Sequence, residues 1–262
     1  MFVGNMVTEA IPARVYSLYK IVVSKKEITR AEVQKCIEPE GIYEGNSYFA
    51  AIFKAATELG LVEIQDNIVI PLIPKEEIKG IEDFKKYVIS KMDSFEGEQF
   101  YEVTNIIVNL NEEIYKYRSV ADTDLLNLLS NQIGKQITAP MARGWRFWAP
   151  FIGLGYVNGM AFLPNAYIYV KNILKILNIE KNKEIAIDEF MAMLGKYGKM
   201  LTSNMQPERN MNLALSSALR ELHDNGEIEL KYSSDAKNRW ILFPSNEAFN
   251  DQIASIIVKG VK

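Results

Sequence analysis

The sequence predicts a mainly α-helical protein with small β-hairpins, built from tandem copies of one structural unit. The order of amphipathic helix, glycine, aliphatic residue, hairpin and proline occurs three times along the 262 residues. The glycine and proline of the successive copies are Gly60 and Pro71, Gly155 and Pro164, and Gly226 and Pro244. The copies lie roughly 70 to 95 residues apart, whereas solenoid repeats have periods of about 20 to 50 residues. We therefore expect three small domains with separate cores, the central one enlarged by extra helices.

The domain boundaries are predicted in two polar stretches, residues 75–80 and residues 178–183. The three domains then cover residues 1–78, 79–180 and 181–262. The spacing of apolar residues predicts the extra helices of the central domain over residues 81–95, 99–115, 125–133 and 165–177.

The first domain has the signals of three helices and a hairpin. Residues 13–23 are amphipathic, and Thr29 begins a second helix in which Glu32 completes a capping box. A third helix is expected over residues 48–59, and Asp66–Asn67 separates two short strand-like runs.

The central domain contains the most regular helix pattern of the chain. One apolar stripe is formed by Ile137, Met141, Trp145, Trp148 and Ile152. Arg143 and Arg146 fall on the opposite side. Thr138 and Pro140 are start signals, and Asn158–Gly159, between two short apolar runs, indicates a tight hairpin after the helix.

The third domain repeats this order near the C-terminus. A first helix is expected over residues 187–194, and a later one over residues 211–222 that ends at Asn225–Gly226. Residues 227–244 are typical of a longer hairpin with a polar, basic tip, and a final amphipathic helix is predicted over residues 246–258.

Charge is distributed unevenly along the chain. The formal net charge is −3, yet residues 125–179 contain no Asp or Glu and carry Lys135, Arg143, Arg146, Lys171 and Lys175. Such a segment would attract a polyanion. Burial is the alternative explanation, because the segment is rich in aromatic and aliphatic residues and carboxylates are costly to desolvate.

The composition argues against most catalytic chemistry. His223 is the single histidine and Cys36 the single cysteine, so nucleophilic triads and zinc sites lack their usual residues. The sequence has no glycine-rich phosphate loop that opens a helix. We therefore expect a protein that is not an enzyme, with no cofactor and no metal site.

The sequence also lacks the signals of export or membrane insertion. Its N-terminus has no basic region followed by an apolar run, and no window approaches 18 apolar residues. We expect a cytoplasmic protein with no membrane partner.

The order of elements resembles the winged helix-turn-helix superfamily, in three imperfect copies that cover most of the chain. In that superfamily the third helix typically enters the major groove and the wing touches the DNA backbone or minor groove. The resemblance implies DNA-contacting residues, which in the central copy are Gln136, Arg143 and Arg146. In the C-terminal copy they are Arg209, Asn212, Ser216 and Arg220 on the helix, and Lys231, Lys237 and Arg239 on the wing. A solvated turn is the alternative for the wing, since hairpin tips are generally polar.

The first copy departs from this pattern. Its third helix offers only Lys54, and Glu38, Glu40 and Glu44 precede that helix, where they would repel phosphates. This copy fits a protein-contact module better.

Shorter motifs are similar to those of a second family. Pro12-Ala-Arg, the run Arg146-Phe-Trp-Ala-Pro-Phe-Ile-Gly-Leu-Gly-Tyr, and Phe162-Leu-Pro-Asn resemble the DpdG proteins, which are encoded beside bacterial DNA-modification and defence genes. This resemblance implies an accessory role in a DNA-processing system.

Two functional hypotheses follow from the sequence. The first is a non-enzymatic protein that binds double-stranded DNA through its central and C-terminal copies. The second is an adaptor that uses winged helices to dock proteins, through the N-terminal domain or the C-terminal helix.

Overall fold

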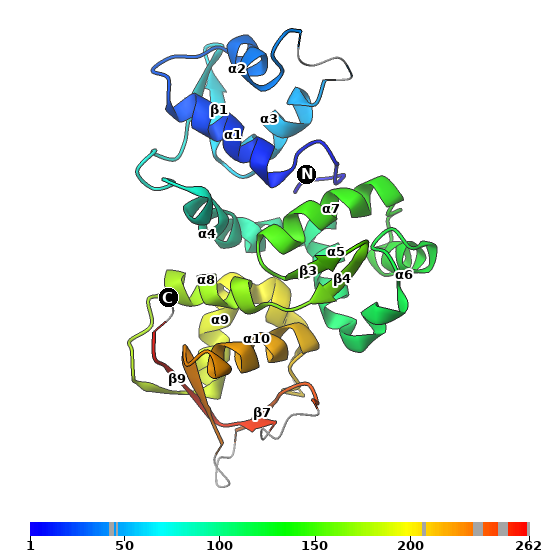
Figure 1. The fold of residues 1–262 in the computed structure, drawn as a ribbon, viewed down its shortest axis with the longest axis vertical. Coiled ribbons are helices and arrows are strands. Elements are labelled where there is room, and N and C mark those ends of the chain that lie inside the picture. The colour runs from blue at the N-terminus through cyan, green and yellow to red at the C-terminus, as the bar shows by residue number, and fades with distance from the viewer. Residues whose placement is uncertain (42–44, 46, 206–207, 233–237, 246–250, 261–262) are drawn as a thin grey trace.

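A computed structural model of the chain describes residues 1–41, 45, 47–205, 208–232, 238–245 and 251–260. The elements form three tiers along the longest axis of the molecule (Figure 1). The chain passes through the tiers in order, so each tier corresponds to one continuous stretch of sequence.

The first tier contains three helices and a β-hairpin. Its elements are α1 (Pro12–Val23), α2 (Arg30–Ile37), α3 (Phe49–Glu58), β1 (Val62–Gln65) and β2 (Ile68–Pro71). The predicted capping box is present, since the amide of Glu32 donates to Thr29 Oγ1 and the amide of Thr29 donates to Glu32 Oε2. Asp66 and Asn67 both have positive φ, as the predicted tight turn requires.

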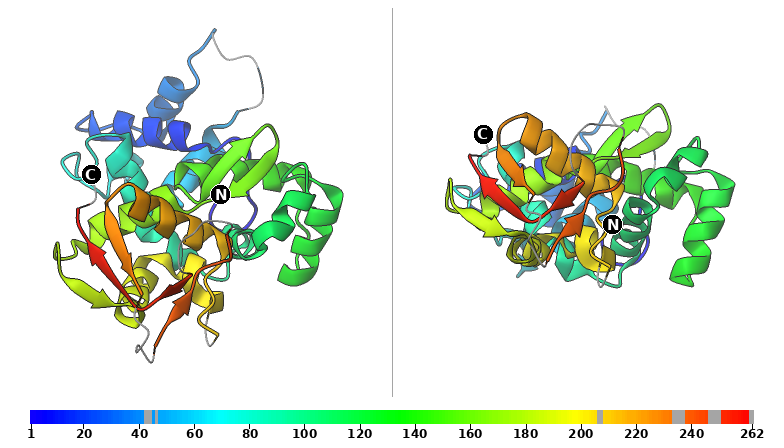
Figure 2. Two further views of the ribbon diagram at one scale, coloured as in Figure 1. Left: turned by 60° about the horizontal axis from the view of Figure 1, so that its bottom comes forward. Right: turned by 90° about the horizontal axis from the view of Figure 1, so that it is seen from below.

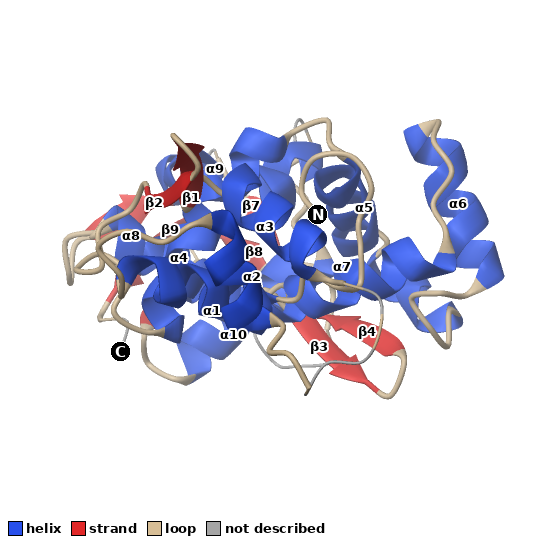
Figure 3. Ribbon diagram, turned by 90° about the horizontal axis from the view of Figure 1, so that it is seen from above, coloured by secondary structure: helices blue, strands red, loops and turns tan. Residues whose placement is uncertain are grey.

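The second tier is mainly helical and ends in a second hairpin. Its elements are α4 (Ile81–Lys91), η1 (Met92–Phe95), α5 (Gln99–Asn109), η2 (Asn111–Lys116), α6 (Thr123–Ile133), α7 (Ala139–Phe151), β3 (Gly155–Asn158) and β4 (Ala161–Pro164). The helices predicted in this region are confirmed, although two of them finish in 3₁₀ turns. Figures 2 and 3 show α6 projecting from one side of the molecule.

The third tier combines helices with an antiparallel sheet. Its elements are α8 (Tyr167–Leu177), β5 (Glu184–Ala186), α9 (Ile187–Thr202), η3 (Ser203–Met205), α10 (Leu213–Asp224), β6 (Ile228–Lys231), β7 (Trp240–Ile241), β8 (Gln252–Ile253) and β9 (Ser255–Val258). The sheet order is β5-β9-β6, and Ile256 of β9 pairs with Ile185 on one side and Leu230 on the other.

Two predictions for the C-terminal region are wrong. Residues 252–258, expected in a helix, form β8 and β9, and the expected pairing within residues 227–244 is replaced by pairing of β6 with β9 and β7 with β8. The reason is burial. All four residues of β9 are buried, and a strand covered on both faces shows no alternation of apolar and polar residues by which it could be recognised. Residues 246–250 lie outside the described part of the chain.

The expectation of separate cores is also wrong, because buried apolar residues from all three tiers form one continuous cluster. The first ten residues contribute to this continuity. Met1, Phe2, Met6 and Ala10 are each at most 2% exposed, and they lie where the first tier meets the second.

The first and third tiers share one strand arrangement. In the first, Thr29 forms a bridge with Ile68, so the segment before α2 pairs with β2, the second strand of the hairpin. In the third, β5 precedes α9 and pairs with β9, the last strand. The second tier has a single corresponding contact, in which the amide of Val120 donates to the carbonyl of Met160 at 3.0 Å.

No helix in the described residues combines the length and the apolar character needed to cross a membrane.

Candidate nucleic-acid interface

Helix α7 is held by two tryptophans on its inner face. Trp145 and Trp148 are fully buried. The indole Nε1 of Trp145 donates to Thr104 Oγ1 of α5 at 2.8 Å, and that of Trp148 donates to the carbonyl of Ala10 at 2.7 Å. Because a buried indole N–H needs a partner, these bonds fix the rotation of the helix about its axis. The predicted apolar stripe of α7 is thereby confirmed as its buried side.

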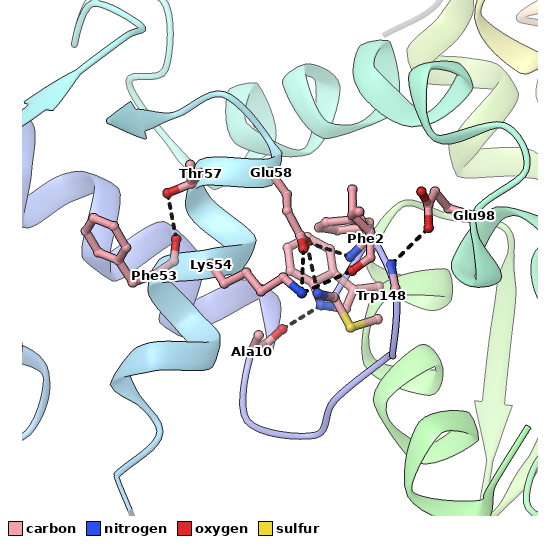
Figure 4. Close-up of polar contacts among 11 residues, drawn as sticks. Phe2, Ala10, Phe53, Lys54, Thr57, Glu58, Glu98 and Trp148 are labelled. Carbon is pink, nitrogen blue, oxygen red and sulfur yellow. Dashed lines mark hydrogen bonds and ion pairs between the residues drawn. The ribbon is translucent and has the colours of Figure 1, made fainter. Parts of the chain in front are cut away.

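Residues 1–10 contact α7 through Ala10 and are themselves held by bonds to Glu58 and Glu98 (Figure 4). The amide of Phe2 donates to Glu58 Oε2 of α3 at 2.8 Å, and the amide of Gly4 donates to Glu98 Oε2 at 2.9 Å. The same segment then reaches Trp148 through Ala10. Residues 1–10 thus connect α3, the start of α5 and α7, which are distant in sequence.

The outer face of α7 carries two of the predicted central residues, Arg143 and Arg146, and Gln136 lies in the segment before the helix. Gln136 and Arg143 are exposed and Arg146 is half-buried. Within the described chain, no carboxylate lies within 4.0 Å of either guanidinium, as the ion pairs of the structure involve other residues. Neither guanidinium is therefore neutralised by a carboxylate of the described residues.

Apolar side chains that the sequence did not single out accompany these arginines. Phe147 is 40% exposed, and Val157 and Met160 of the hairpin are 36% and 41% exposed. The Arg146 guanidinium lies 5.7 Å from the centre of the Phe147 ring, and its Nη1 lies 2.7 Å from Met160 Sδ. We define the central patch as Gln136, Arg143, Arg146, Phe147, Val157 and Met160.

The sequence contained a signal for Phe147 and less of one for Met160. Phe147 follows Arg143 by four residues and so shares its outward face, away from the tryptophans. The strand register places the hairpin turn at Gly159–Met160, one residue later than the Asn158–Gly159 turn predicted, and this shift brings Met160 to the tip.

Tyr156, although 47% exposed, belongs to the other face of the hairpin. Val157 pairs with Phe162, whose ring lies 4.9 Å from that of Trp145, so alternate residues of β3 point away from α7. Partial burial and the negative charge of Glu221 raise the pKa of Tyr156. The central patch is thus confined to the face of the hairpin beside α7.

The predicted contact residues of α10 are turned inward, which corrects the sequence-based assignment. Asn212 is 4%, Ser216 0% and Arg220 7% exposed. Asn212 caps α10 by accepting from the amide of Leu215, and Ser216 Oγ accepts from the amide of Phe243 at 2.7 Å. These side chains stabilise the third tier and are not placed to read a DNA groove.

Arg220 is engaged in the same way. Its Nη2 donates to Asp251 Oδ1 at 2.6 Å and to the carbonyl of Phe243 at 2.7 Å. These two bonds tie α10 to Phe243 and Asp251, which lie between β7 and β8. Arg220 therefore stabilises the fold and is not placed to contact DNA.

The other basic residues predicted to contact DNA that the structure describes in the third tier are partly exposed and paired. Arg209 lies in the loop before α10 and bonds to Asp188 and Asn238, and Lys231 lies 3.6 Å from Glu184. Arg239 donates to Gln252 at 2.8 Å. Lys237 lies outside the described residues. Arg209, Arg239 and Lys231 therefore have acceptors within the protein that would compete with a phosphate.

The first tier keeps the character predicted for it. Lys54 lies 3.6 Å from Glu58. Glu38 accepts from the amides of Tyr48 and Phe49 at the start of α3, and Glu40 is exposed. Glu44 lies outside the described residues. Glu38 therefore places a carboxylate at the beginning of α3, where a DNA-reading helix needs cations.

Both explanations of the acid-free segment apply, to different parts of it. Its tryptophans are buried, as the burial explanation requires, while Lys135, Arg143 and Lys175 are exposed. Lys171 instead forms an ion pair with Glu227 at 2.6 Å. Burial lowers the pKa of Lys171, but the bond to Glu227 outweighs it and leaves that pKa raised.

Comparison with known proteins places the chain in a family. No curated protein and no solved structure matches it. A family model described as DpdG-like matches residues 1–236, which span the three tiers and include every residue of the central patch. The chain belongs to the DpdG-like family.

Proposed function

We propose that this protein is a non-enzymatic nucleic-acid-binding accessory component of a DNA-modification or defence system, and that it binds through the central patch. One observation carries this proposal. Arg143 and Arg146 are accessible and have no carboxylate within 4.0 Å in the described chain, whereas the described basic residues predicted in the third tier are buried or have acceptors within the protein. A guanidinium that no carboxylate neutralises is a ready ligand for phosphate.

The arrangement of the tiers supports a tandem winged-helix architecture of three units. Because α8 (Tyr167–Leu177) belongs to the third tier, we place the second boundary near residues 165–166 and not at the expected residues 180–181. In the first tier, Thr29 before α2 pairs with β2, and the β1–β2 hairpin follows α3. In the third tier, β5 before α9 pairs with β9, and the β6–β9 ribbon follows α10. In this proposal only the central unit retains an outward basic helix. The other two use the same scaffold for packing.

Family membership supports the accessory role. The motifs that resemble DpdG proteins include Arg146 and Phe147 of the patch and Phe162 beneath it. A DNA-binding module without catalytic residues would deliver or position other components on DNA.

Fluorescence anisotropy with labelled DNA over a salt series tests the proposal. We expect binding to weaken steeply with salt, because each neutralised phosphate releases counterions. The double variant Arg143→Glu/Arg146→Glu should lose most of the affinity and reduce the salt slope by about 2.

The matched control is Lys196→Glu, a charge reversal at an exposed position of α9. It should leave the affinity nearly unchanged. Absence of DNA binding at low salt, or equal losses in the control and the double variant, would refute the proposal.

A protein-docking role of the first unit is a second candidate. A cleft of about 350 Å³ lies between α1, α2 and α3, lined by Ala13, Ile37, Tyr48 and Ile52 among others, with Arg14 stacked 4.6 Å from the centre of the Tyr48 ring. Apolar walls and a single placed cation suit a protein side chain better than a phosphate chain. Pull-down of interacting proteins by wild type and Ala13→Glu, a change at an exposed position of the cleft, tests it, with equal recovery counting against it.

A further inference from the structure

The central patch has the chemistry of a surface for unpaired nucleotides, and we infer that its ligand is single-stranded nucleic acid in preference to a regular duplex. This inference rests on the proposed function and specifies its substrate class. It derives from the side chains that the structure places beside Arg143 and Arg146.

The hairpin beside α7 lacks the charges that a duplex backbone would require. Residues 155–164 contain no Lys or Arg, and the hairpin contributes Val157 and Met160 to the patch, each more than a third exposed. Duplex affinity is dominated by cations that neutralise closely spaced phosphates. A wing that presents aliphatic and thioether groups gains little from lying along such a backbone.

The outer face of α7 is also poorly suited to binding in a groove of duplex DNA. Within α7 the outward positions run from Pro140 through Arg143 to Phe147, so the one fully exposed cation of this helix is followed by an aromatic ring. In a duplex the bases are already stacked and offer no face to that ring. An unpaired base has a free face, and stacking on an exposed aromatic side chain is the usual way in which proteins hold single strands.

The relative placement of charge and ring fits this ligand. The guanidinium of Arg146 lies 5.7 Å from the centre of the Phe147 ring, and Arg143 is one turn away on the same helix. A base stacked on Phe147 would have its own phosphate within reach of the arginines, and the thioether of Met160, 2.7 Å from Arg146 Nη1, would lie on the same side. Two cations suffice for a short strand, whose charge density is lower than that of a duplex.

Anisotropy with fluorescent oligothymidylate, oligouridylate and a duplex of equal length, at low salt and on the full chain, tests the inference. We expect the single strands to bind about tenfold or more tightly than the duplex. Phe147→Ala should lower single-strand affinity by about tenfold, the scale of one lost base stack, and leave duplex affinity unchanged. Phe147→Tyr should restore single-strand binding. The control is Tyr115→Ala, which removes a ring that is 54% exposed outside the patch.

The outcomes separate the inference from the proposed function. Duplex binding as tight as single-strand binding, or no effect of Phe147→Ala, overturns the inference and leaves DNA binding intact. No binding of any oligonucleotide overturns both. Equal affinity for thymidylate and uridylate is expected from stacking, whereas tight binding of uridylate alone would identify RNA as the ligand.

Discussion

Gly144 of α7 lies directly against the backbone of Val7. A Cβ atom at Gly144 would stand 2.5 Å from the carbonyl oxygen of Val7 and 2.8 Å from its carbonyl carbon. Glycine is therefore the one residue that lets the N-terminal segment pass this close to the helix. The contact joins the first tier to the element that carries the central patch.

Replacing Gly144 with Val should destabilise the protein. The added side chain must displace backbone, and overpacking of this kind costs about 1–3 kcal/mol. The control is Gly195→Ala in α9, where an added Cβ would meet only Thr202 Oγ1, at 3.5 Å, so the gain in helix propensity should keep stability equal or higher. Thermal unfolding of both variants checks this. A Gly144→Val protein as stable as wild type would contradict the packing described.

Thr104→Val should also lower the free energy of unfolding, by about 1–3 kcal/mol. Valine keeps the volume but leaves the buried Nε1 of Trp145 without the Oγ1 acceptor that now lies 2.8 Å away. Thr57→Val is the matched control, since its hydroxyl is exposed and donates only to the carbonyl of Phe53. Urea denaturation measures both. Equal midpoints for the two variants would show that the indole bond contributes nothing.

Glu38 should make stability depend on pH in the acid range. Partial burial alone would raise its pKa, but bonds from Ser47, Gln34 and the amides of Tyr48 and Phe49 outweigh burial and lower it. A carboxyl whose pKa is lower when folded stabilises the protein fully above its unfolded pKa, about 4.3. That contribution is lost as the pH falls through the folded pKa.

The variant Glu38→Gln should therefore be less stable than wild type at neutral pH, and the difference should shrink below about pH 4. Unfolding by urea at several pH values measures this. The exposed Glu40→Gln is the control and should follow wild type. A Glu38→Gln difference that is constant with pH would contradict the role of Glu38 as the cap of α3.

Arg220→Met should affect stability and not DNA affinity. The substitution removes the bonds to Asp251 and to the carbonyl of Phe243, at a cost of about 1–3 kcal/mol. Thermal unfolding and anisotropy on the same sample separate the two effects. An unchanged melting temperature with loss of DNA binding would return Arg220 to the DNA-contacting set.

The contrast between α7 and α10 shows how far the sequence could predict this site. In α7 the apolar stripe and the arginines separate cleanly around the helix, so local periodicity alone identifies the outward face. In α10 polar residues also occupy the inward face, because Ser216 and Arg220 find partners 27 and 31 residues further along the chain. Such distant partners leave no local trace in a sequence.

The strands also differ in how far the sequence could predict them. The hairpin of the first tier was predictable from its turn, since Asp66 and Asn67 favour the positive φ that they adopt. Strand β9 was not predictable from the sequence, since all four of its residues are buried and it lies between two neighbouring strands. The shared core had no local signal either, as it depends on Trp148 meeting Ala10 across 138 residues.

Photo-crosslinking tests the central claim most directly. An oligonucleotide containing 4-thiothymidine would be irradiated with the full-length protein, and the adducts mapped by mass spectrometry after trypsin digestion. The central claim predicts adducts in the tryptic peptide of residues 147–171, which holds Phe147, Val157 and Met160. The variant Arg143→Glu/Arg146→Glu lacks the cleavage sites at 143 and 146, so its corresponding peptide covers residues 136–171, and that peptide should carry no adducts. Adducts confined to the third tier, or unchanged in that variant, would contradict it.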